Sequence, residues 1–421
     1  METPGSSPQN RLEFGLAVFP TLFFAVAGLL VVDWGRPGFW TSGAPMSGDL
    51  IQHYAAGVFL EQGKEAELYR GFKLGEWITD YTAKLQPGST YSVVRFNYVY
   101  SPLCAGISRA FVGVPFPPLT WAWLAMCCLA YVAAIDWIVR TGLFAPHFRF
   151  VDALWCAGFP SFFLTLVPMQ NTALTLAIAS AAGWLLHLGR PFWAGLVFAS
   201  ASYKPQLLPV IAGFVFLCGG WRFALGVGLG GVAWLGIGIV WLGWPLHELW
   251  LESLTNMADG TQFQREGLNQ SWRGFFLSWP MTEPFATGLW VGTSLVLTGV
   301  TWWLTLRWRR RGGQAADPLW IGLTWCLMVS PYVGHYELLL GLPWWFRVFR
   351  TTFGWIGKGL VALFWLTSAL SITGLASDQM NFSAPLLTLW LIGSLLWLNH
   401  YSTLTPDQPP RTNPHDASTS L

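Results

Sequence analysis

The sequence predicts an all-α, polytopic membrane protein with about 12 transmembrane helices, within a range of about 10 to 13. Of its 421 residues, 53% are hydrophobic and only 10% are charged, whereas soluble domains are about 25% charged. Its 28 tryptophans are typical of many helix ends at membrane–water interfaces. The lipid bilayer is therefore an expected partner. The net charge of +2 gives no reason to expect a nucleic acid.

The first transmembrane helix is predicted at 14–32, where an apolar run follows a short polar tail that carries Arg11. A basic residue on that side favours a cytoplasmic N-terminus, so the first outer loop should extend over about 34–97. Within this loop, segments 50–60 and 72–85 repeat apolar residues at helical spacing. They predict two amphipathic helices that lie in the membrane interface with their polar faces toward water.

About eleven further apolar segments complete the predicted spans, and together they form one transmembrane domain over residues 1–402. These segments are 98–114, 117–139, 151–168, 171–188, 191–218, 222–243, 285–306, 318–333, 335–350, 355–376 and 384–399. Simple alternation places the basic cluster Arg307–Arg311 inside, as the positive-inside rule requires. It places a second polar loop, at about 244–284, outside, and both termini in the cytoplasm. The proline-rich tail 403–421 is predicted to be disordered.

Asp49 lies at the start of the predicted helix 50–60, shortly after the first span. A carboxylate at a boundary between water and lipid could accept a proton from a hydroxyl group. Partial burial would raise its pKa and help it to do so near neutral pH. The alternative is an N-cap, because aspartate is a favoured residue at the start of a helix. The two roles are compatible.

Lys204 stands between two apolar runs, in ASASYKPQLLP, directly before Pro205. A lysine at membrane depth needs an anionic partner or a watery cavity, and the proline breaks the helix by removing a backbone donor. Two interpretations are open: a clamp for a lipid or substrate phosphate, and a lysine that snorkels to the interface. The polar pair Gln170-Asn171 could bind a ligand or simply a neighbouring helix.

Two more polar segments fall on the predicted outer face. Asn269–Ser271, in GLNQSWRGFF, offers donors and acceptors that would suit a sugar ring, although an ordinary exposed loop has the same composition. His335 and Glu337 follow a helix break at Pro331. Ionisable residues so near a membrane favour a function, and the alternative is a pair solvated at the outer surface. The six cysteines lack CxxC spacing, so buried thiols are expected rather than metal ligands.

Taken in chain order, these residues resemble the sequence pattern of glycosyltransferase family 87, the polyprenol-linked mannosyltransferase-like membrane proteins. The motifs that carry the resemblance lie within about 45–345 and are GD at Gly48-Asp49 with Tyr54, LY at Leu68-Tyr69, YxYSPL at Tyr98–Leu103, QN at Gln170-Asn171, AG at Ala194-Gly195, YKPQ at Tyr203–Gln206, LNQSWRGF at Leu268–Phe275 and SPxxxHY at Ser330–Tyr336. Met169 stands where the pattern has a glycine before QN.

The resemblance implies a GT-C type membrane fold. It implies transfer of a mannose-like hexose from a polyprenyl-phosphate sugar donor to a hydroxyl of a glycolipid or glycan acceptor. The transfer inverts the anomeric carbon and takes place at the outer face of the plasma or inner membrane. By position in the pattern, Asp49 is the expected general base, and Lys204 and His335 are expected at the donor phosphate. No cofactor or metal is expected. The other expected substrate-binding residues are Tyr54, Tyr98, Gln170, Asn171, Gln206, Asn269, Gln270, Ser271 and Glu337.

The alternative function is a polytopic transporter or flippase for a lipid-linked or small polar solute, which would use Asp49, Lys204 and His335 along a translocation path. The large polar first loop and the clustering of polar groups on one side disfavour it. A cavity that opens to one face favours the transferase, whereas alternating access favours the transporter. In either case we expect the three residues to face one cavity at the outer boundary. In a structural membrane subunit their convergence would be accidental.

Overall fold

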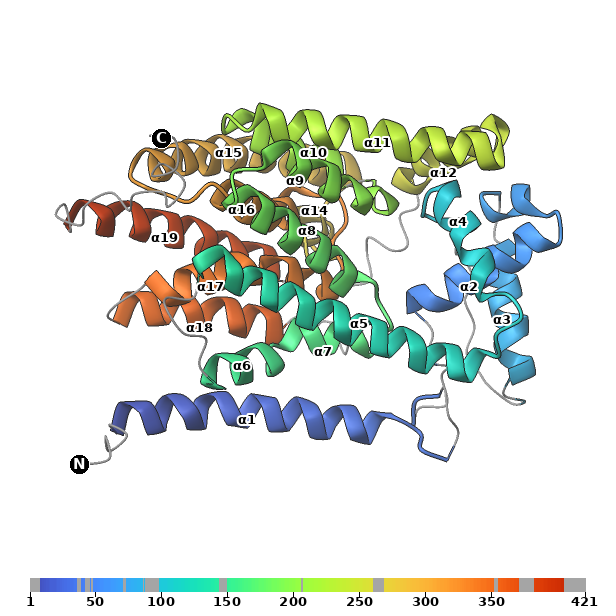
Figure 1. The fold of residues 1–421 in the computed structure, drawn as a ribbon, viewed down its shortest axis with the longest axis horizontal. Helices are drawn as coiled ribbons and strands as arrows, with labels where there is room; N and C mark the ends of the chain where they lie inside the picture. Colours follow the sequence, from blue (N-terminus) through green and yellow to red (C-terminus); the bar gives the residue numbers. More distant parts are fainter. Residues whose placement is uncertain are drawn as a thin grey trace, which may run out of the picture.

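The computed structural model describes residues 8–35, 39–41, 46, 48–70, 73–85, 87, 98–143, 150–205, 207–259, 269–351, 355–370 and 382–404. Over these residues the fold is helical, with eighteen α-helices and one isolated β-bridge between Val32 and Trp40. The prediction of an all-α protein is therefore confirmed. Most of the longer helices run along one common direction and form an elongated bundle (Figure 1).

Four of the described helices contain segments that are long and apolar enough to cross a membrane. They are α1 (Pro8–Val31), α5 (Phe116–Ile138), α11 (Trp221–Leu242) and α15 (Glu283–Arg310). α1 and α11 lie on opposite sides of the bundle (Figure 1). They expose large apolar side chains such as Leu30, at 70%, and Val240, at 89%, which lipid chains would cover. The protein is thus an integral, multi-pass membrane protein.

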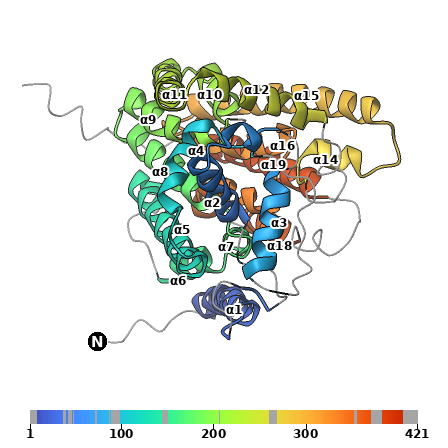
Figure 2. The ribbon, with the colours of Figure 1, turned by 90° about the vertical axis from the view of Figure 1, so that its right-hand side faces the viewer.

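Other helices pack between and beside these long ones (Figure 2). They are α8 (Thr172–His187), α9 (Pro191–Ala199), α10 (Leu208–Leu217), α16 (Asp317–Val329), α17 (Leu342–Thr351), α18 (Trp355–Leu370) and α19 (Ser383–Leu404). Every residue of α16 from Asp317 to Met328 is buried. α16 packs against α10, α15 and α19, so the apolar core is built around a short helix that lipid does not reach.

Several predicted spans are interrupted, so the described helices do not show about 12 continuous spans. The segment predicted at 191–218 is divided into α9, the 3₁₀ turn η4 (Ser200–Tyr203) and α10, and the segment at 151–168 into α6 (Phe150–Ala157) and α7 (Pro160–Leu166). The segment at 98–114 holds α4 (Pro102–Ser108) and η2 (Arg109–Phe111), and the segment at 335–350 holds η5 (His335–Gly341) and most of α17. Prolines that remove a backbone donor accompany three of these breaks: Pro205, Pro160 and Pro102.

The helices of the first polar loop and the first helix of the second lie at one end of the bundle (Figure 1). They are α2 (Gly48–Glu61), η1 (Glu65–Leu68), α3 (Lys73–Leu85) and α12 (Trp244–Asp259). The second loop also holds α14 (Trp272–Leu277), which lies nearer to α15 and α16, and the π-helical turn η3 (Val139–Leu143) ends α5. α3 is amphipathic as predicted, with Leu74 and Ile78 buried and Glu76 exposed. For α2 the prediction of a polar face toward water is wrong. Its residues from Asp49 to Gly57 are buried because α3, α4 and η2 pack around it.

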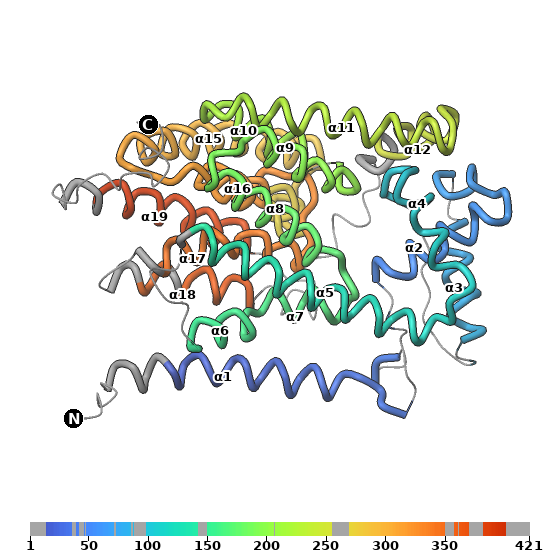
Figure 3. The backbone as a smooth tube through the Cα atoms, in the orientation of Figure 1, coloured from blue at the N-terminus to red at the C-terminus, as the bar shows by residue number. Residues whose placement is uncertain are grey.

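α1 begins and α19 ends at the end of the bundle opposite to α2 and α3 (Figure 3). Simple alternation predicts this arrangement, in which the first and last described helices have these ends on the side opposite to the first loop. Which side faces the cytoplasm stays a prediction. Of the tail predicted to be disordered, residues 405–421 lie outside the described residues.

Candidate functional site

Asp49 belongs to the first turn of α2, and only 4% of its surface is exposed. Its Oδ2 accepts the backbone N–H of Asn171 at 2.9 Å. This contact comes from another segment, so the N-cap interpretation does not account for it. Burial raises the pKa of the Asp49 carboxyl, while the Lys204 ammonium, the Asn171 N–H and the Tyr100 hydroxyl act against the shift. A carboxyl with a raised pKa is suited to accept a proton near neutral pH.

The turn at 168–171 fits closely against Gly48. The Gly48 backbone has a φ of +41°, and a Cβ at this position would lie 1.5 Å from the Pro168 carbonyl oxygen, so only glycine fits. Met169 has a φ of +53°, a left-handed conformation that costs a non-glycine residue roughly 1–2 kcal/mol. Trp123 holds this turn, because its Nε1–H donates to the Met169 carbonyl at 3.1 Å. The backbone conformation thus explains why the family pattern has glycine at this position.

Lys204 and Glu337 form a buried ion pair across 133 positions of the chain. Lys204 Nζ lies 3.2 Å from Glu337 Oε1, and each side chain is 5% exposed. Such burial disfavours a lysine that snorkels to the interface. Lys204 also donates to Thr172 Oγ1 at 3.4 Å. Thr172 directly follows Asn171, whose N–H binds Asp49. We call Asp49, Lys204 and Glu337 the buried charge group. Across the described ranges, no three His, Cys, Asp or Glu side chains are placed to hold a metal ion.

The turn Ser330–Glu337 is held by two residues of the LNQSWRGF motif. Asn269 Nδ2 donates to the Pro331 carbonyl at 2.9 Å, and Asn269 Oδ1 accepts the Val333 N–H at 3.0 Å. The Gln270 N–H donates to the Val333 carbonyl at 2.7 Å. These contacts dock the second polar loop against the turn that carries Glu337.

The exposed-loop alternative for Asn269–Ser271 is wrong, because all three residues are at most 1% exposed. Ser271 is the N-cap of α14, where its Oγ accepts the Gly274 N–H at 3.4 Å. The contacts of these residues are structural, and their role in binding a sugar or an acceptor stays a prediction.

His335 lies next to the buried charge group in the same turn. Glu337 Oε2 accepts the Gly334 N–H at 3.2 Å, which fixes the carboxylate while its other oxygen binds Lys204. Lys204 Nζ lies 5.7 Å from the centroid of the Tyr336 ring, and the His335 ring lies 5.3 Å from the same ring, centroid to centroid. His335 is 7% exposed, and its imidazole makes no hydrogen bond to a described residue. The structure therefore places His335 within two residues of the ion pair.

Two other predicted binding residues, Tyr54 and Tyr98, pack within the first loop. Tyr54 packs in an aromatic cluster with rings from α3 and α5. The Tyr98 hydroxyl lies 3.0 Å from His53 Nδ1, and Tyr98 has no exposed surface. Gln170 Nε2 donates to the Pro168 carbonyl of its own turn, at 3.4 Å. Gln206 lies outside the described residues. The substrate-binding roles of these four residues stay predictions.

Tyr100 is a member of the site that the sequence interpretation did not name. Its hydroxyl accepts a hydrogen bond from Asn171 Nδ2 at 3.1 Å, and the backbone N–H of the same Asn171 donates to Asp49 Oδ2. The available signal was the YxYSPL motif, which holds both Tyr98 and Tyr100. Only the fold shows that the second tyrosine binds Asn171, the residue that contacts Asp49.

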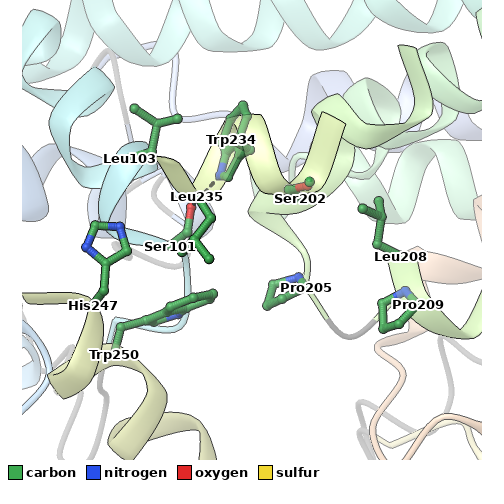
Figure 4. A pocket seen from close by; sticks show the side chains of 11 residues that line it. Ser101, Leu103, Ser202, Pro205, Leu208, Pro209, Trp234, Leu235, His247 and Trp250 are labelled. Carbon is green, nitrogen blue, oxygen red and sulfur yellow. Dashed lines mark hydrogen bonds between the residues drawn. The ribbon is translucent and has the colours of Figure 1, made fainter. Parts of the chain in front are cut away.

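A cavity of about 210 Å³ adjoins the segments that carry Tyr100 and Lys204 (Figure 4). Its lining is mostly apolar and consists of Ser101, Leu103, Ser202, Pro205, Leu208, Pro209, Gly231, Trp234, Leu235, His247 and Trp250. Trp234 Nε1 donates to Ser101 Oγ at 2.9 Å across one side of it. The cavity can therefore take an apolar chain close to a buried cation.

Residues 98–331, more than half of the chain, match glycosyltransferase family 87. The chain belongs to this family. Family 87 membership makes the protein a membrane glycosyltransferase, an enzyme that acts on a sugar donor and an acceptor. The matched range contains Tyr100, Asn171 and Lys204. Asp49 and Glu337 lie outside it, so the match gives no information on these two residues, and their roles stay predictions.

A second similarity is local. Over 95 residues, this family 87 chain is 30% identical to adenosylcobinamide-GDP ribazoletransferase from Laribacter hongkongensis (strain HLHK9). The aligned region covers 22% of this chain and 38% of that relative, so the chain spans less than half the length of the relative it matches. A similarity of this extent does not assign an activity.

Proposed function

We propose that this family 87 protein transfers a mannose-like hexose from a polyprenyl-phosphate donor to a hydroxyl group of a glycolipid or glycan. The reaction would take place on the outer face of the plasma or inner membrane, within a GT-C type architecture. The observation that supports this proposal best is the buried charge group, in which Asp49, Lys204 and Glu337 come together from three distant segments. Burial of ionisable residues in a membrane protein costs free energy, so such residues usually mark a functional site.

Asp49 is the general base of the proposed reaction. It takes the proton from the acceptor hydroxyl while the acceptor oxygen forms a bond to the anomeric carbon of the sugar. The bond between that carbon and the phosphate oxygen breaks at the same time, and its electron pair leaves with the polyprenyl phosphate. Attack from the face opposite to the phosphate inverts the anomeric carbon. The raised pKa of the Asp49 carboxyl supports this role, because a stronger base accepts the proton more readily.

Lys204 and His335 are the proposed contacts of the donor phosphate. A positive group placed where negative charge grows on the leaving phosphate stabilises the transition state. Lys204 is the buried cation of the group, and His335 lies in the turn that carries its partner Glu337. The phosphate would share Lys204 with Glu337.

The cavity beside Lys204 supports a lipid-linked donor. Its walls include Pro205 next to the lysine and two indole rings, Trp234 and Trp250 (Figure 4). Branched apolar isoprene units would fill such a space and gain the free energy of leaving water, about 25 cal/mol for each Å² buried. A donor with its phosphate on Lys204 and its first isoprene units in the cavity would account for both the buried lysine and the apolar cavity beside it.

The substitution Asp49→Asn tests the proposed base. Asparagine has the size of aspartate and can still accept the Asn171 N–H, but it cannot take up a proton. We expect transfer from a polyprenyl-phosphate sugar in liposomes to fall by about 100-fold or more, with unchanged thermal unfolding. Turnover near that of the wild type would show that Asp49 is not the base.

Lys204→Gln should behave differently in the same assay. Because it removes a charge-assisted contact to phosphate, we expect donor affinity to fall by about tenfold or more, with a smaller loss of turnover at saturating donor. If the wild type shows no transfer but moves a lipid-linked sugar between the leaflets, and both variants lose that movement, the transporter alternative is correct.

A further inference from the structure

The cavity beside Lys204 is suited to an apolar group. None of the described residues that line it is an aspartate, glutamate, lysine or arginine. Its polar groups bind the protein itself: the Trp234 indole donates to Ser101 Oγ at 2.9 Å. The Ser202 hydroxyl donates to a backbone carbonyl at 2.6 Å, and His247 Nδ1 lies 2.8 Å from another carbonyl. A polar ligand would find few free partners here, whereas an apolar chain needs none.

The volume of this cavity limits how much of a lipid chain it can hold. An apolar protein cavity of about 150 Å³ binds one benzene molecule, which has six carbon atoms. On that scale, a cavity of about 210 Å³ holds about eight carbon atoms. An isoprene unit has five carbons, so the cavity holds between one and two units, and the rest of a long chain has to lie outside it.

α11 separates the cavity from the bilayer. Gly231, Trp234 and Leu235 line the cavity, because residues three and four apart share one face of a helix. Val232 and Ile237 of the same helix are 68% and 57% exposed, as side chains that face lipid should be. α11 also runs along the outside of the bundle (Figure 1). One face of the helix thus lines the cavity and another faces lipid, so a chain that outgrows the cavity can continue into the bilayer.

Gly231 leaves room in the cavity because it has no side chain. A Cβ at this position would meet no atom within 4 Å, so a larger residue fits there without a clash. Leucine would add four carbons to the wall, nearly as many as one isoprene unit has. Gly236 lies on the same helix, is not one of the lining residues, and has equally open space for a Cβ. Since leucine is a better helix former than glycine, neither Gly231→Leu nor Gly236→Leu should destabilise α11.

We propose that the cavity recognises only the first one or two isoprene units of the donor, those next to the phosphate, and that Gly231 determines how many of them fit. Pro205 lines the cavity and directly follows Lys204, so a phosphate on the lysine places these first units at the cavity. The inference rests on the proposed function, in which the donor is a polyprenyl-phosphate sugar. Donors longer than two units are then equivalent to the enzyme.

The test compares the full-length wild type with Gly231→Leu on mannosyl-phosphate donors that carry one, two, three and ten isoprene units. The quantity measured for each donor is the ratio of the two kcat/KM values, because partition of the donor into liposomes affects both proteins equally. We expect a ratio near one for the single unit. From two units on, the wild type should be favoured by about tenfold or more, since one unit then stays outside the smaller cavity. The ratio should be the same for two, three and ten units.

A second measurement follows binding without transfer. Dimethylallyl, geranyl and farnesyl phosphate carry one, two and three isoprene units and no sugar, and their dissociation constants are measured by calorimetry. The affinity ratio between the wild type and Gly231→Leu should follow the same pattern as the transfer ratio. Inorganic phosphate has no chain and should bind both proteins equally. The matched control is Gly236→Leu, which should keep the wild-type values in both measurements.

The outcomes separate this inference from the proposed function. If the ratio is the same for one unit as for two, or if it keeps growing from two units to ten, the cavity does not set the limit. Equal effects of Gly231→Leu and Gly236→Leu, or prenyl phosphates that bind no better than inorganic phosphate, also contradict the inference. If the prenyl phosphates follow the expected pattern but no sugar is transferred, the cavity has the proposed role and the proposed function is wrong.

Should Gly231→Leu fail to fold, Leu235→Ala gives the test in the opposite direction. Leu235 lines the cavity and is 38% exposed, and alanine removes three carbons from the wall. The larger cavity should raise the affinity for farnesyl phosphate relative to the wild type by more than the affinity for geranyl phosphate. Equal changes for the two ligands would overturn the inference.

Discussion

The charge balance around Lys204 sets how the site can accept a donor. With both carboxylates ionised, the buried charge group of Asp49, Lys204 and Glu337 holds two negative charges and one positive charge. Each side chain of the Lys204–Glu337 pair is 5% exposed, so solvent screens them little. If the donor phosphate binds Lys204 as proposed, it would add one more negative charge and compete with Glu337 for the lysine. Glu337 would then stabilise the lysine while the donor is absent and limit donor affinity when it arrives.

Glu337→Gln should expose this competition. Removal of the direct partner of Lys204 breaks a buried ion pair, which costs about 3–5 kcal/mol, so we expect a lower unfolding temperature than in the wild type. In the proposed site, the donor phosphate would give Lys204 a direct anionic partner again. Addition of donor should therefore raise the unfolding temperature of Glu337→Gln by more than that of the wild type.

The control for this measurement is Glu76→Gln on α3. Glu76 pairs with Lys73 at 2.8 Å, but the two side chains are 60% and 57% exposed. Exposed pairs contribute about 0–1 kcal/mol, so stability should hardly change. An equal donor-induced rise in Glu337→Gln and the wild type would mean that the phosphate does not bind at Lys204.

At the scale of elements, the start of α2 depends on its first glycine. We expect Gly48→Ala to cost about 3 kcal/mol or more, because the added Cβ overlaps the Pro168 carbonyl and overpacking adds to the cost of a positive φ. Either α2 or the turn at 168–171 has to move, which separates Asp49 from the Asn171 N–H. Chemical unfolding and the transfer assay should both report the loss.

Gly63 provides the matched control for this substitution. It also has a positive φ, of +67°, but a Cβ there meets no atom within 4 Å. Gly63→Ala should therefore cost about 1–2 kcal/mol from the backbone alone and keep full transfer activity. Equal effects of the two substitutions would show that the close fit of Gly48 against the turn is unimportant.

The same elements show what the sequence could and could not predict. Composition and apolar runs correctly predicted a helical membrane protein, because hydrophobicity depends on the residues alone. The breaks within 191–218 and 151–168 were missed, since both segments stay apolar through the prolines that divide them. Periodicity in α2 suggested a solvated polar face, but burial of that face depends on α3 and α4, which pack over it. Whether Tyr98 or Tyr100 binds Asn171 beside Asp49 depends on a non-helical segment, for which no periodic pattern exists.

At the scale of the whole molecule, short helices make room for the polar site. α8 has 16 residues and α16 has 13, so at 1.5 Å per residue they are about 24 and 20 Å long, whereas the apolar core of a bilayer is about 30 Å thick. The buried charge group lies beside the start of α8 and in the turn that follows α16. Irregular backbone at membrane depth is tolerated where protein buries it or where it lines a cavity. The segments that carry Lys204 and Glu337 meet this condition, because both side chains are buried.

The predicted orientation can be checked with single cysteines at the two ends of the bundle. Glu76→Cys on the exposed face of α3 should react with an impermeant thiol reagent added to intact cells. Arg310→Cys at the end of α15 should react only after permeabilisation, because the basic cluster favours the cytoplasmic side. The unmodified protein gives the background from the native cysteines. The reverse pattern would place the first loop, and Asp49 with it, inside.

The ion pair between Lys204 and Glu337 also has a consequence for the order in which the protein is assembled. The two residues are 133 positions apart, and at about 5–20 residues per second the ribosome needs on the order of ten seconds to make the intervening chain. Until then Lys204 lacks its carboxylate, and insertion of an unpaired lysine at the centre of a membrane helix costs about 2.5–3.5 kcal/mol. We therefore expect the connection between α9 and α10 to reach its final depth only after η5 has been synthesised.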